Sequence, residues 1–278
     1  MKKILMISLS VFLLIIIGAA YYKSTEELAK DLPVQTTTER QEDEKGTHNI
    51  SVEIISADVE KSDIAEISYA YPIFSGINDQ SVQEKINDDI KNRIVSAADG
   101  SRGDVEEFCP SGQEADESLA GWVCRFGYDS EYESFTQYSG KILSVRLETY
   151  MYTGGAHGDT VVEFINYDLQ SGEKFDWRDT FVSDSDYLVR IAEYAKTELR
   201  QKLLEGEYAM TEEEWIETGS MPSPENYNTN VGFSEDALLV VYQSYQVAPY
   251  ALGQITVLIP YDKLRGIVDS EGLLGINI

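Results

Sequence analysis

Apolar and polar residues alternate in short stretches along most of the chain. The alternation covers residues 49–71, 142–152 and 161–169, and it returns over 237–245 and 254–259. A period of two residues is typical of strands with one buried face. In the second of these stretches we expect one face to point to the core, namely Leu143, Val145, Leu147, Thr149 and Met151.

Other segments have apolar residues at helical spacing. One opens with a capping box at residues 81–84 and is predicted to end at Gly100. Another has a single apolar stripe over residues 188–203, and shorter helices are predicted over 211–218 and 261–268. The order of elements predicts an α+β fold with mostly antiparallel sheets, packed by two main amphipathic helices.

The beginning of the chain has a different pattern. Lys2 and Lys3 precede an apolar segment over residues 4–22, which at about 1.5 Å per residue spans roughly 28 Å, close to the hydrocarbon thickness of a bilayer. We therefore expect an N-terminal membrane anchor, with the N-terminus in the cytoplasm and the rest of the chain outside. Cleavage near Ala20 is the alternative, and it would leave a secreted or periplasmic protein.

Shifts in composition divide the chain into five parts. Residues 1–22 form the anchor or signal peptide, and residues 23–48 lack apolar periodicity, which predicts an acidic flexible tether. A first α+β module is expected over 49–166 and a second over 167–268, followed by a tail at 269–278.

The charge of the chain excludes one class of partner. It has 49 acidic and 22 basic side chains, for a net charge of -27. Binding to nucleic acid depends on Lys and Arg neutralising phosphates, so we expect no nucleic-acid partner. Two histidines and two cysteines do not supply the usual His-rich zinc site, and no segment fits a known calcium loop. We therefore expect no metal and no cofactor.

The two cysteines, Cys109 and Cys124, bracket a polar segment. In an exported chain this pattern favours a disulfide. Closing a loop of about 15 residues is worth roughly 3 kcal/mol if the bond acts by constraining the unfolded chain.

A glycine-rich motif over residues 152–158 lies between two of the predicted strands. Glycine lets the backbone approach other groups closely, as in ligand-binding loops, which makes Tyr152, Gly154, Gly155 and His157 candidate ligand-binding residues. The motif also fits a plain hairpin turn in which the histidine binds a backbone carbonyl. Catalysis by His157 would need a nucleophile and an orienting carboxylate, and the local sequence marks neither.

The motif is one of several that together resemble a bacterial envelope family. The resemblance runs from Asn49 to Val268 and is carried by residues 152–158, 166–169, 171–172, 179–181, 245–251 and 259–261. It points to paired domains of unknown function, found in the ectodomains of lysozyme-sensing anti-sigma factors and in the non-catalytic N-terminal region of certain peptidoglycan deacetylases. The resemblance adds Tyr250 to the candidate ligand-binding residues.

The departures from these relatives shape the expected function. Only three residues precede the apolar segment, so sigma regulation is not expected, and the chain ends ten residues after Val268, so deacetylase activity is not expected. We expect an exported, membrane-tethered module without enzymatic activity that binds an envelope protein or glycan. A cationic muramidase of the lysozyme type and peptidoglycan are the candidate ligands.

A glycan hydrolase that uses two carboxylates as acid and base is the alternative. The carboxylates near the motif, which are guesses among the 49 acidic residues, are Glu148, Asp159, Glu163 and Asp168.

Overall fold

A six-stranded sheet forms the N-terminal half of the fold. Its strands follow chain order: β1 (Glu39–Arg40), β2 (Ser51–Lys61), β3 (Ala65–Ser75), β4 (Phe126–Thr136), β5 (Ile142–Tyr152) and β6 (Asp159–Asp168). Neighbouring strands are antiparallel except β3 and β4. That pair is parallel because the chain crosses over between them through the helix α2 (Gln80–Phe108).

The computed structural model describes residues 39–40, 50–61, 65–108, 126–136, 141–152, 156–205 and 210–275. The predicted anchor, most of the predicted tether, Cys109 and Cys124 lie outside these ranges. Both the anchor and the disulfide therefore stay predictions. In the described ranges, the search for a helix long and apolar enough to cross a bilayer finds none.

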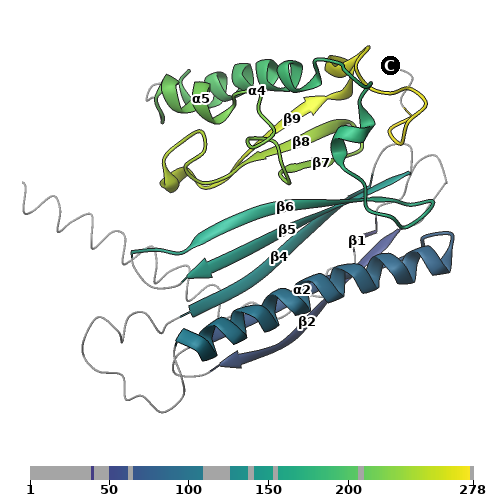
Figure 1. The fold of residues 1–278 in the computed structure, drawn as a ribbon, viewed down its shortest axis with the longest axis vertical. Coiled ribbons are helices and arrows are strands. Elements are labelled where there is room, and N and C mark those ends of the chain that lie inside the picture. The colour runs from purple at the N-terminus through teal and green to yellow at the C-terminus, as the bar shows by residue number, and fades with distance from the viewer. Residues whose placement is uncertain are drawn as a thin grey trace, which may run out of the picture. The chain divides into compact units, whose positions relative to one another are not determined.

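Helix α2 lies against one face of this sheet (Figure 1). Its buried stripe is Val82, Ile86, Ile90 and Ile94. These side chains pack on residues such as Leu143, Val145 and Ile165 from β5 and β6.

Both predicted ends of this helix are wrong. The N-terminal cap is Asp79, whose Oδ1 accepts hydrogen bonds from the Ser81 and Val82 amides at 2.8 and 3.4 Å, so the residues of the supposed capping box already lie inside the helix. At the other end the helix continues through Gly100 to Phe108. Glycine ends a helix by adopting a positive φ, and Gly100 is not among the glycines that do so.

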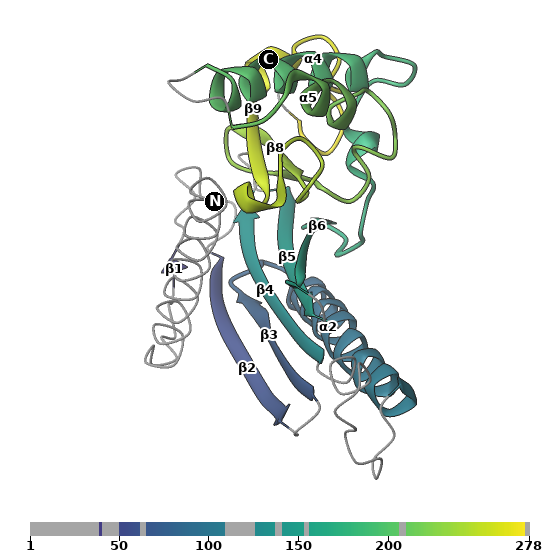
Figure 2. The same cartoon turned by 90° about the vertical axis from the view of Figure 1, so that its left-hand side faces the viewer.

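A three-stranded antiparallel sheet and two helices form the C-terminal half. The strands are β7 (Val231–Phe233), β8 (Ala237–Tyr242) and β9 (Ile255–Pro260), and the helices are α4 (Tyr187–Leu203) and α5 (Glu213–Gly219). Figures 1 and 2 show α4 and α5 on one side of this sheet and the six-stranded sheet on its other side. The predicted α+β class with antiparallel sheets is confirmed.

The closing helix predicted over residues 261–268 is also wrong. Only a short 3-10 turn, η3 (Tyr261–Leu264), forms there. The chain then turns at Gly266, whose φ is +77°, and Val268 pairs with Phe181 as an isolated antiparallel bridge. The backbone pairing of Val268 with Phe181 therefore forms in place of further helix.

The two sheets are joined by buried hydrogen bonds. Ser144 Oγ donates to Asn166 Oδ1 at 2.6 Å and accepts from the Phe233 amide at 2.9 Å, while Asn166 Nδ2 donates to the Val231 carbonyl at 3.1 Å. Both polar side chains are 5% exposed or less. They satisfy backbone groups of β7 that would otherwise be buried without partners.

The contact between the two sheets changes the burial predicted for β5. Leu143, Val145 and Leu147 are buried on the α2 side as expected. Ser144 is buried as well, because the second sheet covers the opposite face. Met151 was expected in the core but is 50% exposed, since it lies at the far end of the strand.

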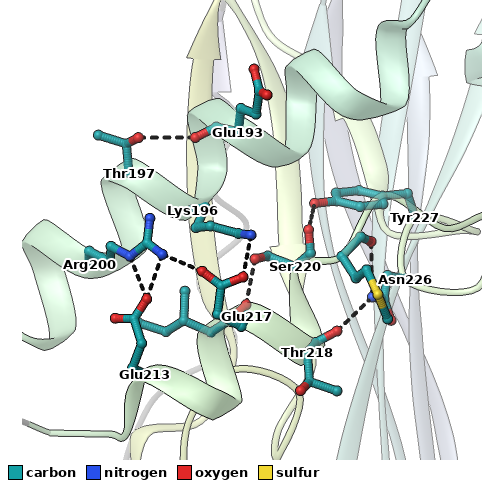
Figure 3. Close-up of polar contacts among 12 residues, drawn as sticks. Glu193, Lys196, Thr197, Arg200, Glu213, Glu217, Thr218, Ser220, Asn226 and Tyr227 are labelled. Atoms are coloured by element: carbon teal, nitrogen blue, oxygen red, sulfur yellow. Dashed lines mark hydrogen bonds and ion pairs between the residues drawn. The ribbon is translucent and has the colours of Figure 1, made fainter.

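Ion pairs hold α5 beside α4 (Figure 3). Lys196 Nζ lies 2.6 Å from Glu217 Oε2, and Arg200 binds both Glu213 and Glu217. The pKa of Glu217 is lowered, first by the hydrogen bond from Lys196. The basic side chains on this side of α4 are thus matched by carboxylates of α5.

Beside this network lies a buried tyrosine pair. The Tyr227 hydroxyl donates to the Ser220 carbonyl at 2.9 Å (Figure 3). It also lies 3.0 Å from the Tyr242 hydroxyl. Burial raises the pKa of Tyr227 to about 12.

Two glycine substitutions test these boundaries and contacts. A Cβ at Gly100 would meet nothing within 4 Å, so Gly100→Ala should stabilise the protein by about 0.5–1 kcal/mol. A Cβ at Gly232 would lie 2.2 Å from Phe164 Cδ1 between the sheets, so Gly232→Ala should cost about 1–3 kcal/mol. Urea unfolding measures both changes in stability. If Gly100→Ala destabilises the protein, the helix ends at Gly100 as the sequence predicts.

The tyrosine pair predicts a loss of stability in alkali. Since the folded state keeps Tyr227 protonated up to a pKa of about 12, the unfolded state ionises first, above its ordinary value of 10. The contribution is complete below pH about 10 and falls by up to about 1.4 kcal/mol per pH unit between about 10 and 12. In a series of urea unfolding curves, Tyr227→Phe should have a shallower decline, and an equal decline in both proteins would contradict the assignment.

Candidate ligand-binding site

The free edge of β6 is closed by groups from the C-terminal half. The side-chain amide of Gln243 accepts from the Val162 amide at 3.0 Å and donates to the Val162 carbonyl at 2.7 Å, as a paired strand would do. Further along the edge, the Phe164 amide donates to the Thr229 carbonyl at 2.7 Å. The Thr229 bond fixes the segment that precedes β7 against β6, and the Gln243 bonds do the same for the segment that follows β8.

The same segment also holds α5. Gln246 Oε1 accepts from the Gln243 amide at 2.9 Å, and its Nε2 donates to the Gly219 carbonyl at 2.9 Å. A Cβ at Gly219 would lie 1.8 Å from the Gln246 carbonyl oxygen, so only glycine allows this approach. The end of α5 is therefore placed by the connection between β8 and β9.

Four aromatic rings meet where these segments converge, and we call His157, Trp215, Tyr245 and Tyr250 the aromatic cluster. The rings of His157 and Tyr250 are stacked, with centroids 3.9 Å apart. Tyr245 lies 5.4 Å from Tyr250, 6.4 Å from His157 and 6.5 Å from Trp215, tilted by 33–37° to each. His157 and Tyr245 are exposed, the latter by 53%, and the other two are half-buried.

The Gly158 carbonyl ties the cluster to the hairpin between β5 and β6. The Tyr250 hydroxyl donates to it at 2.6 Å, and His157 Nδ1 lies 2.9 Å from it. Because a carbonyl only accepts, Nδ1 carries the proton. In the neutral form of the ring Nε2 is then an acceptor, and it lies 3.4 Å from the Tyr245 hydroxyl. A Cβ at Gly158 would lie 2.4 Å from the Tyr150 ring, so the glycine permits this packing.

Tyr245 has an unusual backbone. Its φ is +66°, in the left-handed region that bulky residues rarely adopt. Such outliers persist only where neighbouring contacts enforce them, and they concentrate at functional sites. Here Gln243 and Gln246 hold the residues on either side.

One acidic side chain, Asp159, lies near the cluster. The pKa of Tyr250 is raised, first by burial and then by the charge of Asp159 and by Tyr245. Asp159 is exposed at the start of β6, directly after Gly158. A carboxylate therefore lies within electrostatic reach of the rings.

The structure brings two of the five sequence-predicted candidates into contact, His157 and Tyr250. Tyr152 is half-buried at the end of β5, and Gly154 and Gly155 lie outside the described residues. Ligand binding by these residues stays a prediction.

Sequence reasoning missed Trp215 and Tyr245. Tyr245 begins one of the motifs that carry the family resemblance, so a signal for it was present. Trp215 had none, because only the packing of α5 on the turn after β8 brings it to the cluster.

The carboxylates of the hydrolase alternative are mostly engaged elsewhere. Glu148 pairs with Arg146, and Glu163 pairs with Arg93 at 2.6 Å. Asp168 accepts from the Gln170 amide and the Ser171 hydroxyl, at 2.9 and 2.7 Å, in the turn after β6. Of the four, only Asp159 lies at the cluster. Within the described part of the chain, no group of three His, Cys, Asp or Glu side chains is placed to hold a metal ion.

Two family models match the chain. Residues 58–160 match the one described as deacetylase PdaC, and residues 178–262 match DUF3298, a protein family of unknown function. The resemblance inferred from the motifs is confirmed by these matches. His157 belongs to the first matched segment, and the other three members of the aromatic cluster belong to the second.

One curated relative is the peptidoglycan-N-acetylmuramic acid deacetylase PdaC of Bacillus subtilis (strain 168). It is 30% identical over 135 residues, which are 48% of this chain and 28% of the relative. The chain thus matches less than a third of that protein's length.

Solved structures share the fold. A member of the DUF3298 family from Bacteroides fragilis NCTC 9343 superposes with a TM-score of 0.58 at 19% identity, over 82% of this chain and 97% of that one. A DUF3298 family protein from Pseudomonas aeruginosa PAO1 has a TM-score of 0.50 at 17% identity, over 80% and 95%. At these identities the likeness concerns the fold alone.

The hydroxyl of Tyr250 provides a test of the site's construction. Tyr250→Phe keeps the ring stack but removes the bond to the Gly158 carbonyl, and it should lower the free energy of unfolding by about 0.5–1.5 kcal/mol. Tyr245→Phe is the matched control, because its hydroxyl makes only a contact of 3.4 Å and its removal should change stability by less than about 0.5 kcal/mol. Urea unfolding of the three proteins measures this, and equal stability would mean that the bond to Gly158 does not hold the hairpin.

Proposed function

We propose that this chain is a non-catalytic module of the cell envelope that binds a glycan through the aromatic cluster. The observation that carries the proposal is the meeting of four rings, two of them exposed, on three separate segments of the fold. The C–H faces of a sugar ring are apolar and pack on aromatic faces, while tyrosine and histidine add polar tips for the hydroxyl groups.

The state of the carboxylates supports binding over hydrolysis. A glycosidase needs two carboxyl groups flanking the scissile bond, one of them free to protonate the leaving group. Glu148, Glu163 and Asp168 are held in ion pairs or in a turn. Asp159 alone lies beside the rings, which leaves the hydrolase without a second group among these four.

The envelope setting is supported by two observations. The curated relative is named for peptidoglycan, and residues 58–160, which include His157, match the family model described as deacetylase PdaC. The apolar residues 4–22 behind Lys2 and Lys3 favour export, with the folded part outside the membrane. We therefore include anchoring through this segment in the proposal.

A cationic muramidase is the second candidate ligand, and the net charge of -27 favours it. Attraction of this kind is long-ranged and weakens as salt is added, whereas ring stacking is little affected. Binding to lysozyme that vanishes between low and physiological salt would mark an electrostatic encounter without a built interface.

Binding to isolated glycan strands tests the proposal. Purified peptidoglycan glycan strands should bind the folded protein, and His157→Ala and Tyr245→Ala should each weaken binding about fivefold or more, as loss of an aromatic anchor does. Calorimetric titration measures the affinity.

Val189→Ala is the matched control, because Val189 is an exposed apolar residue on α4, outside the cluster. It should leave binding unchanged. If the wild-type protein is folded and binds no glycan strand, or if all three variants bind equally, the cluster is not a glycan site.

A further inference from the structure

Asp159 is the first residue of β6 and follows His157 of the aromatic cluster by two positions. It follows Gly158, whose carbonyl binds both Tyr250 and His157, so its backbone adjoins the stacked pair. Its side chain is exposed, and one carboxylate oxygen accepts from the Thr160 amide at 3.0 Å. Among the ion pairs of the described residues, none includes Asp159.

The rings themselves favour positive charge. The faces of tyrosine and tryptophan rings attract cations through their quadrupoles. In its neutral form His157 adds Nε2 as an acceptor, since its Nδ1 donates to the Gly158 carbonyl. Each group that the cluster presents to solvent is therefore neutral or electron-rich.

Nearby basic residues do not reverse this balance. Lys196 and Arg200 of α4 are paired with Glu213 and Glu217 on α5, the helix that carries Trp215. Since the chain as a whole has a charge of -27, a cationic ligand is drawn to it from a distance as well.

We propose that Asp159 makes the aromatic cluster selective for glycans whose amino groups are free rather than acetylated. The ammonium group of such an amino sugar lies on the ring itself. One monomer can therefore stack on the cluster and place its charge at the neighbouring carboxylate. A lysine side chain offers the charge without the ring, which is why the geometry points to a glycan. This inference rests on the proposed glycan-binding function.

Chemically defined oligosaccharides test the selectivity. Oligomers of glucosamine and of N-acetylglucosamine of equal length are titrated into the full chain at pH about 7, where carboxylic side chains are ionised and an imidazole with its ordinary pKa of about 6.5 is mostly neutral. The wild-type protein should bind the glucosamine oligomer more tightly. Asp159→Asn should weaken that binding about two- to fivefold, the range of an exposed ion pair, and leave binding of the acetylated oligomer unchanged.

Glu235→Gln is the matched charge control. Glu235 is exposed in the turn between β7 and β8, at the opposite end of β8 from the cluster, so its removal should affect neither oligomer. The preference for glucosamine should also shrink as salt is added, because an exposed ion pair is screened.

The other outcomes distinguish a failure of this selectivity from a failure of the proposed glycan-binding function. If the acetylated oligomer binds as well as glucosamine, the selectivity is overturned while glycan binding stands. If neither the oligomers nor the glycan strands bind, both the selectivity and the proposed glycan-binding function are wrong. If oligolysine binds as tightly as the glucosamine oligomer and loses as much affinity in Asp159→Asn, the site reads charge alone and the assignment to amino sugars is wrong.

Discussion

The free edge of β6 is the constraint on which the rest of the site depends. This strand packs between α2 and the second sheet, so its outward backbone groups need partners within the protein. No strand supplies them on this side in the described part of the chain. The amide of Gln243 takes that role at Val162, and the Thr229 carbonyl does so at Phe164. Once Gln243 is fixed, the turn that follows it lies beside the hairpin between β5 and β6, and tyrosines of that turn meet His157.

The buried pair Ser144 and Asn166 connects the two halves in a similar way. Each side chain bonds the other and a backbone group of β7, so the sheets are joined by a hydrogen-bonded network as well as by apolar packing. Removing either partner would leave buried polar groups without bonds, which costs more than the bond contributes. The two halves match different family models, yet the aromatic cluster takes residues from both. A ligand that binds the cluster therefore binds only when the halves are docked.

Sequence patterns predicted the elements whose period was carried by many residues. The strand over residues 142–152 and the helix over 188–203 are examples, because a repeated apolar face outweighs single exceptions. Features that depend on one residue were missed. Gly100 has a helical backbone because no positive φ is imposed there, and Ser144 is buried because a strand 89 positions later covers it. Local sequence contains no information on such a contact.

The site, like the fold, was predicted only in part from the sequence. His157 and Tyr250 came from motifs, whereas Trp215 enters only through the approach of Gly219 to Gln246. The arrangement of the site is also why we propose binding and not catalysis. General acid and base groups need carboxyls released from other bonds, and the fold holds most nearby carboxylates in ion pairs and turns. What it leaves at the surface is aromatic area beside the carboxylate of Asp159. In the proposed function such a surface would discriminate between ligands by shape and charge, and the strained backbone of Tyr245 fits a residue held in place for contact.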